Sequence, residues 1–178
     1  MYVLDKGKII WLYGRPCSGK TAIGNELVNR LSAMGIPHFF LDGDELRSAV
    51  NSDLGFSAEH RFENIRRAAE LACLIAKQKQ AAVVCAFITP LNDLRELVKS
   101  VAEKHRLPLH AYFVNTATEE CMRRDAKGHY KLAKEGMLAS FTGVSSSFEE
   151  PEPVAPMLST PEMSTAECAD KILQDLMD

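Results

Sequence analysis

A phosphate-binding loop pattern marks the residues best placed to do chemistry. Residues 14–21 match G-x-x-x-x-G-K-[ST] and lie between a run that predicts a strand and a segment that predicts a helix. Glycines let the backbone approach a phosphate, and the amides of the following helix point at it. A lysine then holds the β and γ phosphates, and a hydroxyl ligates Mg²⁺. We therefore expect ATP or GTP and Mg²⁺ to be bound by Gly14, Arg15, Pro16, Cys17, Ser18, Gly19, Lys20 and Thr21.

The crest of this loop is unusual. Pro16 and Cys17 stand where small residues are expected. Proline has no amide hydrogen, so one donor of the phosphate cradle is missing. The change favours weaker binding of a triphosphate.

Two carboxylates follow the second predicted strand, in Asp42-Gly43-Asp44. Ligands of α/β sheets bind outside the carboxyl ends of the strands, where this turn lies. Asp42 or Asp44 could join the Mg²⁺ shell or accept a proton from an attacking hydroxyl. The alternative is a simple turn in which Asp44 caps a helix. The chain has no N-K-x-D motif for guanine, which disfavours a GTPase.

Short apolar runs alternate with amphipathic segments along the chain. The alternation predicts an α/β fold with a parallel sheet and helices on both faces. The predicted strands are Ile9–Tyr13, His38–Leu41, Ala81–Phe87 and His110–Val114. The predicted helices are Ala22–Met34, Ala58–Lys79, Pro90–His105 and Ala117–Arg124.

Several helix starts carry capping signals. Thr116 to Glu119 and Ser164 to Glu167 are typical of capping boxes, and Thr89 with Pro90 is typical of an N-cap and first helical residue. The proline-rich stretch 148–161 predicts a loop before the last helix. In the long helix, one apolar stripe faces the sheet and leaves Arg61 and Asn64 together on another face; it comprises Phe62, Ile65, Ala69, Ala72 and Ala76.

The whole chain reads as one domain over residues 1–178. Its 178 residues suffice for one core, and 46% hydrophobic with 25% charged residues disfavours disorder. A net charge of −3 gives no basic footprint for nucleic acid or an anionic membrane, and no apolar run is long enough to span a bilayer. Five cysteines without a C-x-x-C pair favour reduced thiols. We expect a cytoplasmic protein.

Six segments resemble the adenylylsulfate kinases (APS kinases) over roughly residues 7 to 176. They are 42–47 (DGDELR), 51–57 (NSDLGFS), 61–67 (RFENIRR), 87–90 (FITP), 124–131 (RDAKGHYK) and 141–143 (FTG). The resemblance implies a P-loop nucleoside-kinase-like three-layer sandwich with a lid at about 123–148, and a homodimer. It implies transfer of the ATP γ-phosphate to the ribose 3′-hydroxyl of adenylyl sulfate, with ATP and Mg²⁺ bound.

The resemblance also assigns roles to single residues. Lys20 and Asp44 would be catalytic, with Asp44 orienting or deprotonating the hydroxyl, and Thr21 with Asp42 would hold the metal. Arg124 and Lys127 would cover the nucleotide. The acceptor would be bound by Asp42, Asp44, Arg47, Phe56, Arg61, Asn64, Ile88, Thr89, Lys131 and Phe141. Among these, Arg47, Arg61 and Asn64 would hold its phosphosulfate end, and Phe56 and Phe141 would stack on its base.

The chain also departs from the family pattern. Thr89 stands where the family usually has a serine that is described as phosphorylated, so Thr89 is a further catalytic candidate. Its predicted N-cap role explains the hydroxyl without a phospho-enzyme and favours direct transfer of the phosphate from ATP to the acceptor. Leu91 and Asn92 replace a basic position after Pro90, and Ser145 and Phe148 replace an Asp and a Tyr. The alternatives are the same chemistry on another nucleotide-linked anion, such as cytidine diphosphoramidate, and a catalytically weak nucleotide-binding module.

Overall fold

The computed structural model describes residues 5–125, 128–137, 141–152 and 155–177. Within these ranges, five strands form one parallel sheet in the order β2-β3-β1-β4-β5. The strands are β1 (Lys8–Tyr13), β2 (His38–Asp42), β3 (Ala82–Phe87), β4 (Leu109–Asn115) and β5 (Met157–Ser159). The first four agree with the predicted runs, and the parallel sheet confirms the α/β fold class.

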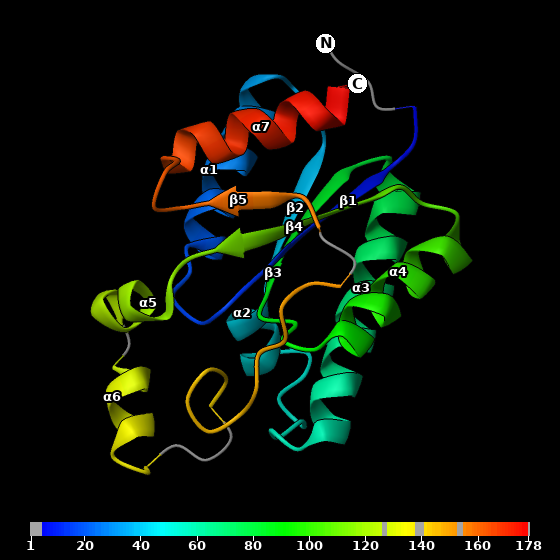
Figure 1. The fold of residues 1–178 in the computed structure, drawn as a ribbon. Coiled ribbons are helices and arrows are strands. Elements are labelled where there is room, and N and C mark those ends of the chain that lie inside the picture. Colours follow the sequence, from blue (N-terminus) through cyan, green and yellow to red (C-terminus); the bar gives the residue numbers. More distant parts are fainter. Residues whose placement is uncertain (1–4, 126–127, 138–140, 153–154, 178) are drawn as a thin grey trace.

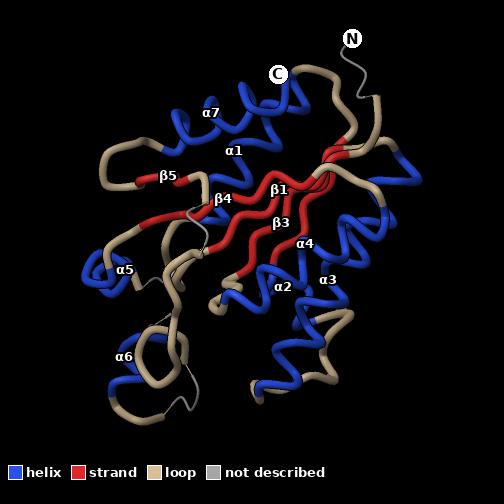
Figure 2. The backbone as a smooth tube through the Cα atoms, turned by 45° about the vertical axis from the view of Figure 1, so that its right-hand side comes forward, coloured by secondary structure: helices blue, strands red, loops and turns tan. Residues whose placement is uncertain are grey.

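Helices cover both faces of the sheet. Figures 1 and 2 show α3 and α4 on one face and α1 and α7 on the other. The helices are α1 (Lys20–Ala33), α2 (Gly43–Ser48), α3 (Ala58–Lys79), α4 (Asn92–His105), α5 (Thr118–Arg124), α6 (His129–Lys134) and α7 (Thr165–Met177). This arrangement is the predicted three-layer sandwich.

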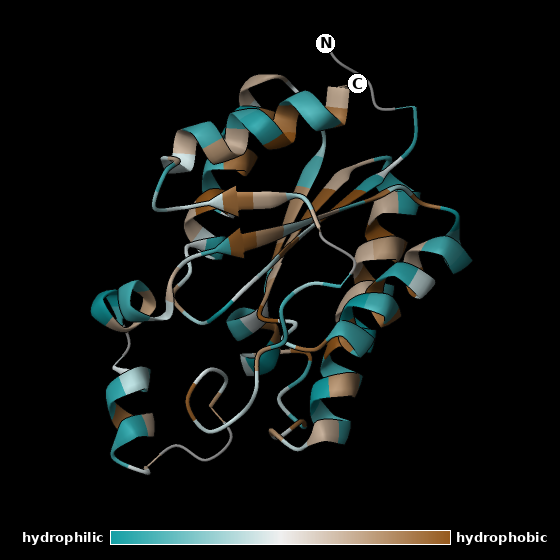
Figure 3. Cartoon of the chain, viewed as in Figure 1, coloured by the Kyte–Doolittle hydropathy of each residue, from teal (hydrophilic) through white to brown (hydrophobic). Residues whose placement is uncertain are grey.

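The alternation of side chains along β1 divides the core into two apolar layers. Trp11 and Tyr13 point into the layer under α3 and α4, whereas Ile10 and Leu12 point into the layer under α1 and α7. All four are buried, and Figure 3 shows hydrophobic residues concentrated on the strands. A strand buried on both faces needs an unbroken apolar run, which is why β1 is recognisable in the sequence.

The crevice between the layers lies beyond the carboxyl ends of the strands. The chain leaves β1 toward α1 on one face and leaves β3 toward α4 on the other, so the two connections diverge. Ligands of open α/β sheets bind where connections diverge in this way. Helices α2, α5 and α6 lie at this end of the molecule (Figure 1).

The predicted loop at 148–161 is corrected by the structure. Residues Met157–Ser159 form β5, which pairs with β4 through the register Phe113↔Met157, Val114↔Leu158 and Asn115↔Ser159. Three residues between prolines are too short to show a strand periodicity, and pairing at a sheet edge needs the fold around it.

One capping box is confirmed and the other two helix starts are wrong. The Ser164 amide donates to Glu167 Oε2 at 2.8 Å, and the Glu167 amide donates to Ser164 Oγ at 3.2 Å. In contrast, α5 begins after Ala117 and α4 begins after Leu91. The hydroxyl of Thr116 instead donates to the Ser18 carbonyl at 2.8 Å, so a tertiary contact replaces the predicted cap.

One smaller prediction and one alternative are also wrong. Phe62, in the second turn of α3, is 45% exposed, whereas the other four members of its stripe are buried. Asp44 does not cap α2; Asp42 does, because its Oδ1 accepts the Asp44 amide at 2.9 Å.

Candidate active site

The phosphate loop is held between the central strands. The Gly14 amide donates to the Ile88 carbonyl at 3.2 Å, which joins the loop to the end of β3. Gly14 has to be glycine because a Cβ there would lie 2.6 Å from the Val114 carbonyl oxygen. Gly19 has φ +106° and precedes α1, which has no side-chain cap. The first amides of α1 therefore remain available to an anion.

Lys20 lies inside this loop. Its Nζ donates to the carbonyls of Gly14 at 3.0 Å and Arg15 at 2.7 Å, and it lies 3.3 Å from Ser18 Oγ. Burial lowers the pKa of Lys20 to about 8. The ammonium therefore still carries its proton at neutral pH and lies where the predicted phosphates would meet it.

The loop crest departs from a glycine-rich turn, as the sequence indicates. Cys17 has φ +60°, in the left-handed region that favours glycine. The Pro16 carbonyl accepts the Tyr130 hydroxyl at 3.2 Å, which ties the crest to α6.

A hydroxyl and a carboxylate meet below the loop. Thr21 Oγ1 donates to Asp42 Oδ2 at 2.8 Å, and Asp42 is buried. The pairing confirms that the two predicted metal residues lie together. Hydroxyl and carboxylate oxygens are the ligands that Mg²⁺ prefers, so this donor set fits the ion.

A cavity of about 230 Å³ adjoins the start of α1. Its lining includes Gly19, Ile23, Arg124, Thr160 and Met163. The Arg124 guanidinium donates to the Ser18 carbonyl at 3.4 Å and is oriented by Glu120. An apolar wall facing a guanidinium plane fits a flat base. Lys127, the other predicted nucleotide residue, lies outside the described residues.

Two arginines form a cationic site across the crevice from the loop. Arg47 donates to the Gly55 carbonyl at 3.0 Å and stacks 4.7 Å from the Phe56 ring centroid. Arg61 donates to the Phe56 carbonyl and to Thr142 Oγ1, both at 3.0 Å. Burial and the neighbouring Arg61 charge lower the pKa of Arg47, and burial lowers that of Arg61. Paired guanidiniums that repel each other favour an anion between them.

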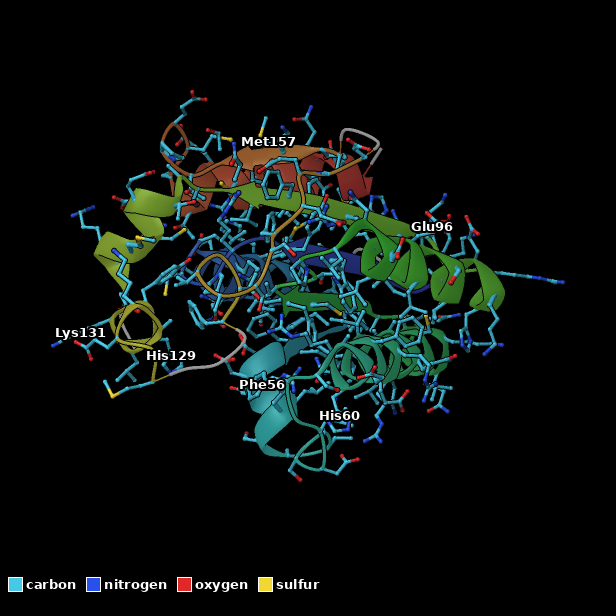
Figure 4. The ribbon with its side chains drawn as sticks, turned by 60° about the horizontal axis from the view of Figure 1, so that its bottom comes forward. Phe56, His60, Glu96, His129, Lys131 and Met157 are labelled. Atoms are coloured by element: carbon cyan, nitrogen blue, oxygen red, sulfur yellow. The ribbon has the colours of Figure 1, made fainter. Side chains whose placement is uncertain are left out.

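The other predicted acceptor residues are spread over several elements, and only some lie near the arginine pair. Asn64 is buried on α3, one turn from Arg61. Phe141 packs edge-on against Tyr130 at 5.0 Å, and among the described residues no ring contact joins it to Phe56. Figure 4 shows Phe56 apart from Lys131, which lies on the outer side of α6. Lys131 is exposed and is not brought to the arginine pair.

Thr89 lies deep beside the site. It is buried with φ +42°, and its Oγ1 accepts the Trp11 indole N–H at 3.0 Å. The hydroxyl is therefore held by the core of the sheet, which corrects its predicted N-cap role.

Comparison with known proteins settles the family. The family model described as adenylylsulphate kinase matches residues 6–158. The chain belongs to the adenylylsulfate kinase family. It is 40% identical over 173 residues to an adenylyl-sulfate kinase of Bacillus licheniformis, covering 97% of this chain and 86% of the relative.

Solved structures of adenylylsulfate kinases agree with the fold. The Mycobacterium tuberculosis APS kinase CysC, solved in complex with AMPPNP and APS, matches with a TM-score of 0.91 at 35% identity, over 97% of this chain and 98% of that one. A gluconokinase of Sinorhizobium meliloti matches at 16% identity and TM-score 0.60, over 99% of this chain and 94% of that one, and shares the fold alone. Within the described ranges, no helix is long and apolar enough to cross a membrane.

Arg95 is a functional candidate in this adenylylsulfate kinase that the sequence did not reveal. It donates to the carbonyls of Thr89 at 3.1 Å, Pro90 at 3.1 Å and Glu149 at 2.7 Å. Its guanidinium also lies 5.2 Å from the Phe148 ring centroid. Two departures from the family pattern, Asn92 and Phe148, thus meet at one cation supplied by α4, since Arg95 also donates to Asn92 Oδ1 at 2.6 Å. No spacing rule predicts the contacts with Phe148 and Glu149, because these residues lie more than 50 positions from Arg95 in the chain.

Proposed function

We propose that this protein transfers the γ-phosphate of ATP to the ribose 3′-hydroxyl of adenylyl sulfate, giving 3′-phosphoadenylyl sulfate. The observation that carries the proposal is the placement of two charged half-sites at one end of the sheet. The loop around Lys20 suits a triphosphate, and the Arg47 and Arg61 pair suits a second anion. Family membership, with a relative solved in complex with AMPPNP and APS, supports these two ligands.

On the donor side, the loop amides and Lys20 hold the phosphate tail and balance the charge that spreads over the transferred group. Thr21 and Asp42 hold Mg²⁺, which supplies charge neutralisation to the phosphate oxygens when bound. Arg124 covers the base from the cavity beside α1, and Lys127, outside the described residues, is the second nucleotide-binding residue of the proposal.

On the acceptor side, Asp44 orients the ribose hydroxyl and accepts its proton. Arg47, Arg61 and Asn64 hold the phosphosulfate end, because guanidinium and amide donors suit its anionic oxygens. Phe56 and Phe141 bind the base, with Phe56 exposed and ready to stack. Lys131 approaches the acceptor when α6 moves inward.

Transfer is direct and in line. The buried Thr89 hydroxyl already accepts the Trp11 N–H, and its backbone is held by Arg95. A phospho-enzyme route would require this hydroxyl to leave the indole and reach the nucleotide. We further propose that the protein works in the cytoplasm as a homodimer; its mass by light scattering tests the dimer.

The experiment that tests this function measures ADP release with ATP, Mg²⁺ and a panel of acceptors. Turnover at low micromolar adenylyl sulfate is expected. Turnover only with a cytidine conjugate, or no turnover with any acceptor, would reject the proposal. Asp44→Asn should lower kcat at least about a hundredfold, as lost acid-base work does. Glu45→Gln, on the next exposed carboxylate of α2, is the matched control.

A further inference from the structure

Asn51 is a buried amide beside the acceptor residues that the proposed function leaves without a role. It lies in the turn after α2 and is fully buried. Its Nδ2 donates to Asn64 Oδ1 at 3.0 Å. Its own Oδ1 is, among the described residues, the one buried side-chain oxygen or nitrogen without a hydrogen-bond partner.

An unpaired buried oxygen makes Asn51 costly for stability alone. Leaving a buried acceptor unsatisfied costs at least as much free energy as one hydrogen bond contributes. The fold of the turn depends on the backbone instead, since the Asn51 amide donates to the Leu46 carbonyl and the Leu54 amide donates to the Asn51 carbonyl. The side chain therefore points to a purpose other than holding the turn.

The contact with Asn51 fixes which atoms Asn64 offers. A side-chain amide has an oxygen acceptor on one side and an NH₂ donor on the other. Because Asn51 donates to Oδ1, both donors on Nδ2 of Asn64 remain for other partners, and Arg61 lies three residues earlier on the same side of α3. If the pair were reversed, Asn64 would present a carbonyl oxygen, which repels an anion.

We infer that Asn51 is a positioning residue that orients the Asn64 amide so that its donors face the anionic end of the acceptor. The inference rests on the proposed function, because it assumes an acceptor with anionic oxygens at Arg61 and Asn64. Asn51 does not touch the acceptor; it acts through Asn64.

A double-mutant cycle in the full-length protein tests this role. Asn51→Ala should raise KM for adenylyl sulfate about tenfold, as losing a hydrogen bond to a charged group does, while KM for ATP and the melting temperature change little. In an Asn64→Ala background, adding Asn51→Ala should change the acceptor KM less than about twofold. Asn29→Ala, on an exposed position of α1, is the matched control.

A second variant distinguishes orientation from packing and covers a failure of the first to fold. Asn51→Asp keeps the size of the side chain, but its carboxylate cannot donate to Asn64 Oδ1. It should therefore turn Asn64 around and raise the acceptor KM more than Asn51→Ala does.

The outcomes separate the inference from the function on which it rests. If the wild-type protein turns over adenylyl sulfate but the folded Asn51 variants keep its acceptor KM, the role of Asn51 alone is overturned. The same holds if the effects of the two substitutions in the cycle are additive. No turnover of adenylyl sulfate by the wild-type protein overturns the proposed function, and the role of Asn51 falls with it.

Discussion

Lys20 is surrounded by oxygens of its own loop, and its burial has a consequence for pH. Its pKa lies at about 8 rather than at the ordinary 10.5. Between these pH values the nucleotide-free folded protein has lost the Lys20 proton, whereas the unfolded chain still carries it. The unfolded chain binds more protons between these values, so the cost of burying Lys20 fades as pH rises from about 8 to 10.5. Binding of a triphosphate should pull the proton back.

The expected result is a kcat/KM for ATP that falls as pH rises through about 8. The value of kcat should hold to higher pH, because bound phosphates stabilise the ammonium. Steady-state rates across pH 6.5 to 10 check this, and nucleotide binding by Lys20→Arg, whose guanidinium stays charged, should lack the decline. A flat kcat/KM profile for the wild-type protein would contradict the assigned role.

Cys17 carries a backbone strain that glycine would relieve. A side chain in the left-handed region destabilises the fold by about 1–2 kcal/mol. Replacing it with glycine removes this strain but adds about 0.5–1 kcal/mol of backbone entropy lost on folding. Cys17→Gly should therefore stabilise the protein by about 0.5–1 kcal/mol and raise its melting temperature by about 2 °C. Calorimetry measures this. Cys17→Ala keeps the Cβ and should show no gain, so an equal gain in both variants argues against backbone strain.

At the scale of elements, residues 148–150 are fastened to the phosphate loop and to α4. Phe148 lies between two guanidiniums, with Arg15 at 4.5 Å and Arg95 at 5.2 Å from its ring centroid. Arg15 also pairs with Glu150 at 2.9 Å, and the Glu149 amide donates to the Pro90 carbonyl. These contacts link Arg15 of the phosphate loop, the turn at Pro90 and residues 148–150.

Arg95→Ala should release this segment, because the Arg95 side chain joins the Glu149 carbonyl and the Phe148 ring to the Thr89 and Pro90 carbonyls. Amide hydrogen exchange of a peptide covering residues 148–152 should accelerate at least about tenfold as local opening becomes easier. Mass spectrometry of the exchanged protein provides the measurement. Arg106→Ala, at the exposed far end of α4, serves as the control; unchanged exchange in Arg95→Ala would show that the fastening lies elsewhere.

The elements that could be predicted are those whose own residues carry the signal. β1 is an apolar run of five buried residues, and α3 spans Ala58–Lys79 as its periodicity predicts. β5 could not be predicted, because its three residues become a strand only beside β4. Thr89 and Thr116 failed as caps for the same reason, since their hydroxyls find partners far along the chain.

The candidate site divides in the same way. Thr21 and Asp42 could be predicted as a metal pair because the phosphate-loop motif supplies the hydroxyl and the end of the next strand supplies the carboxylate. Asn51 and Arg95 were missed because their partners, Asn64 and Glu149, come close only after folding. A sequence motif identifies residues that are close together in the chain, whereas the orientation of their side chains is set by residues that are distant in the chain.

At the scale of the molecule, remote segments close over one end of the sheet. The Tyr130 hydroxyl reaches the Pro16 carbonyl, and Arg61 on α3 reaches Thr142 and Ser146. Such closure excludes water from the phosphoryl group, which would otherwise be lost to hydrolysis. The whole arrangement serves transfer to one hydroxyl.

The measurement that tests this account most directly follows the labelled γ-phosphate of ATP into product, with adenylyl sulfate and its 3′-deoxy analogue as acceptors. The account predicts label on the 3′-oxygen of adenylyl sulfate and none on its 3′-deoxy analogue, while the two compounds compete for the same site. Label on the 3′-deoxy compound, or release of labelled inorganic phosphate at equal rates with both, would contradict it.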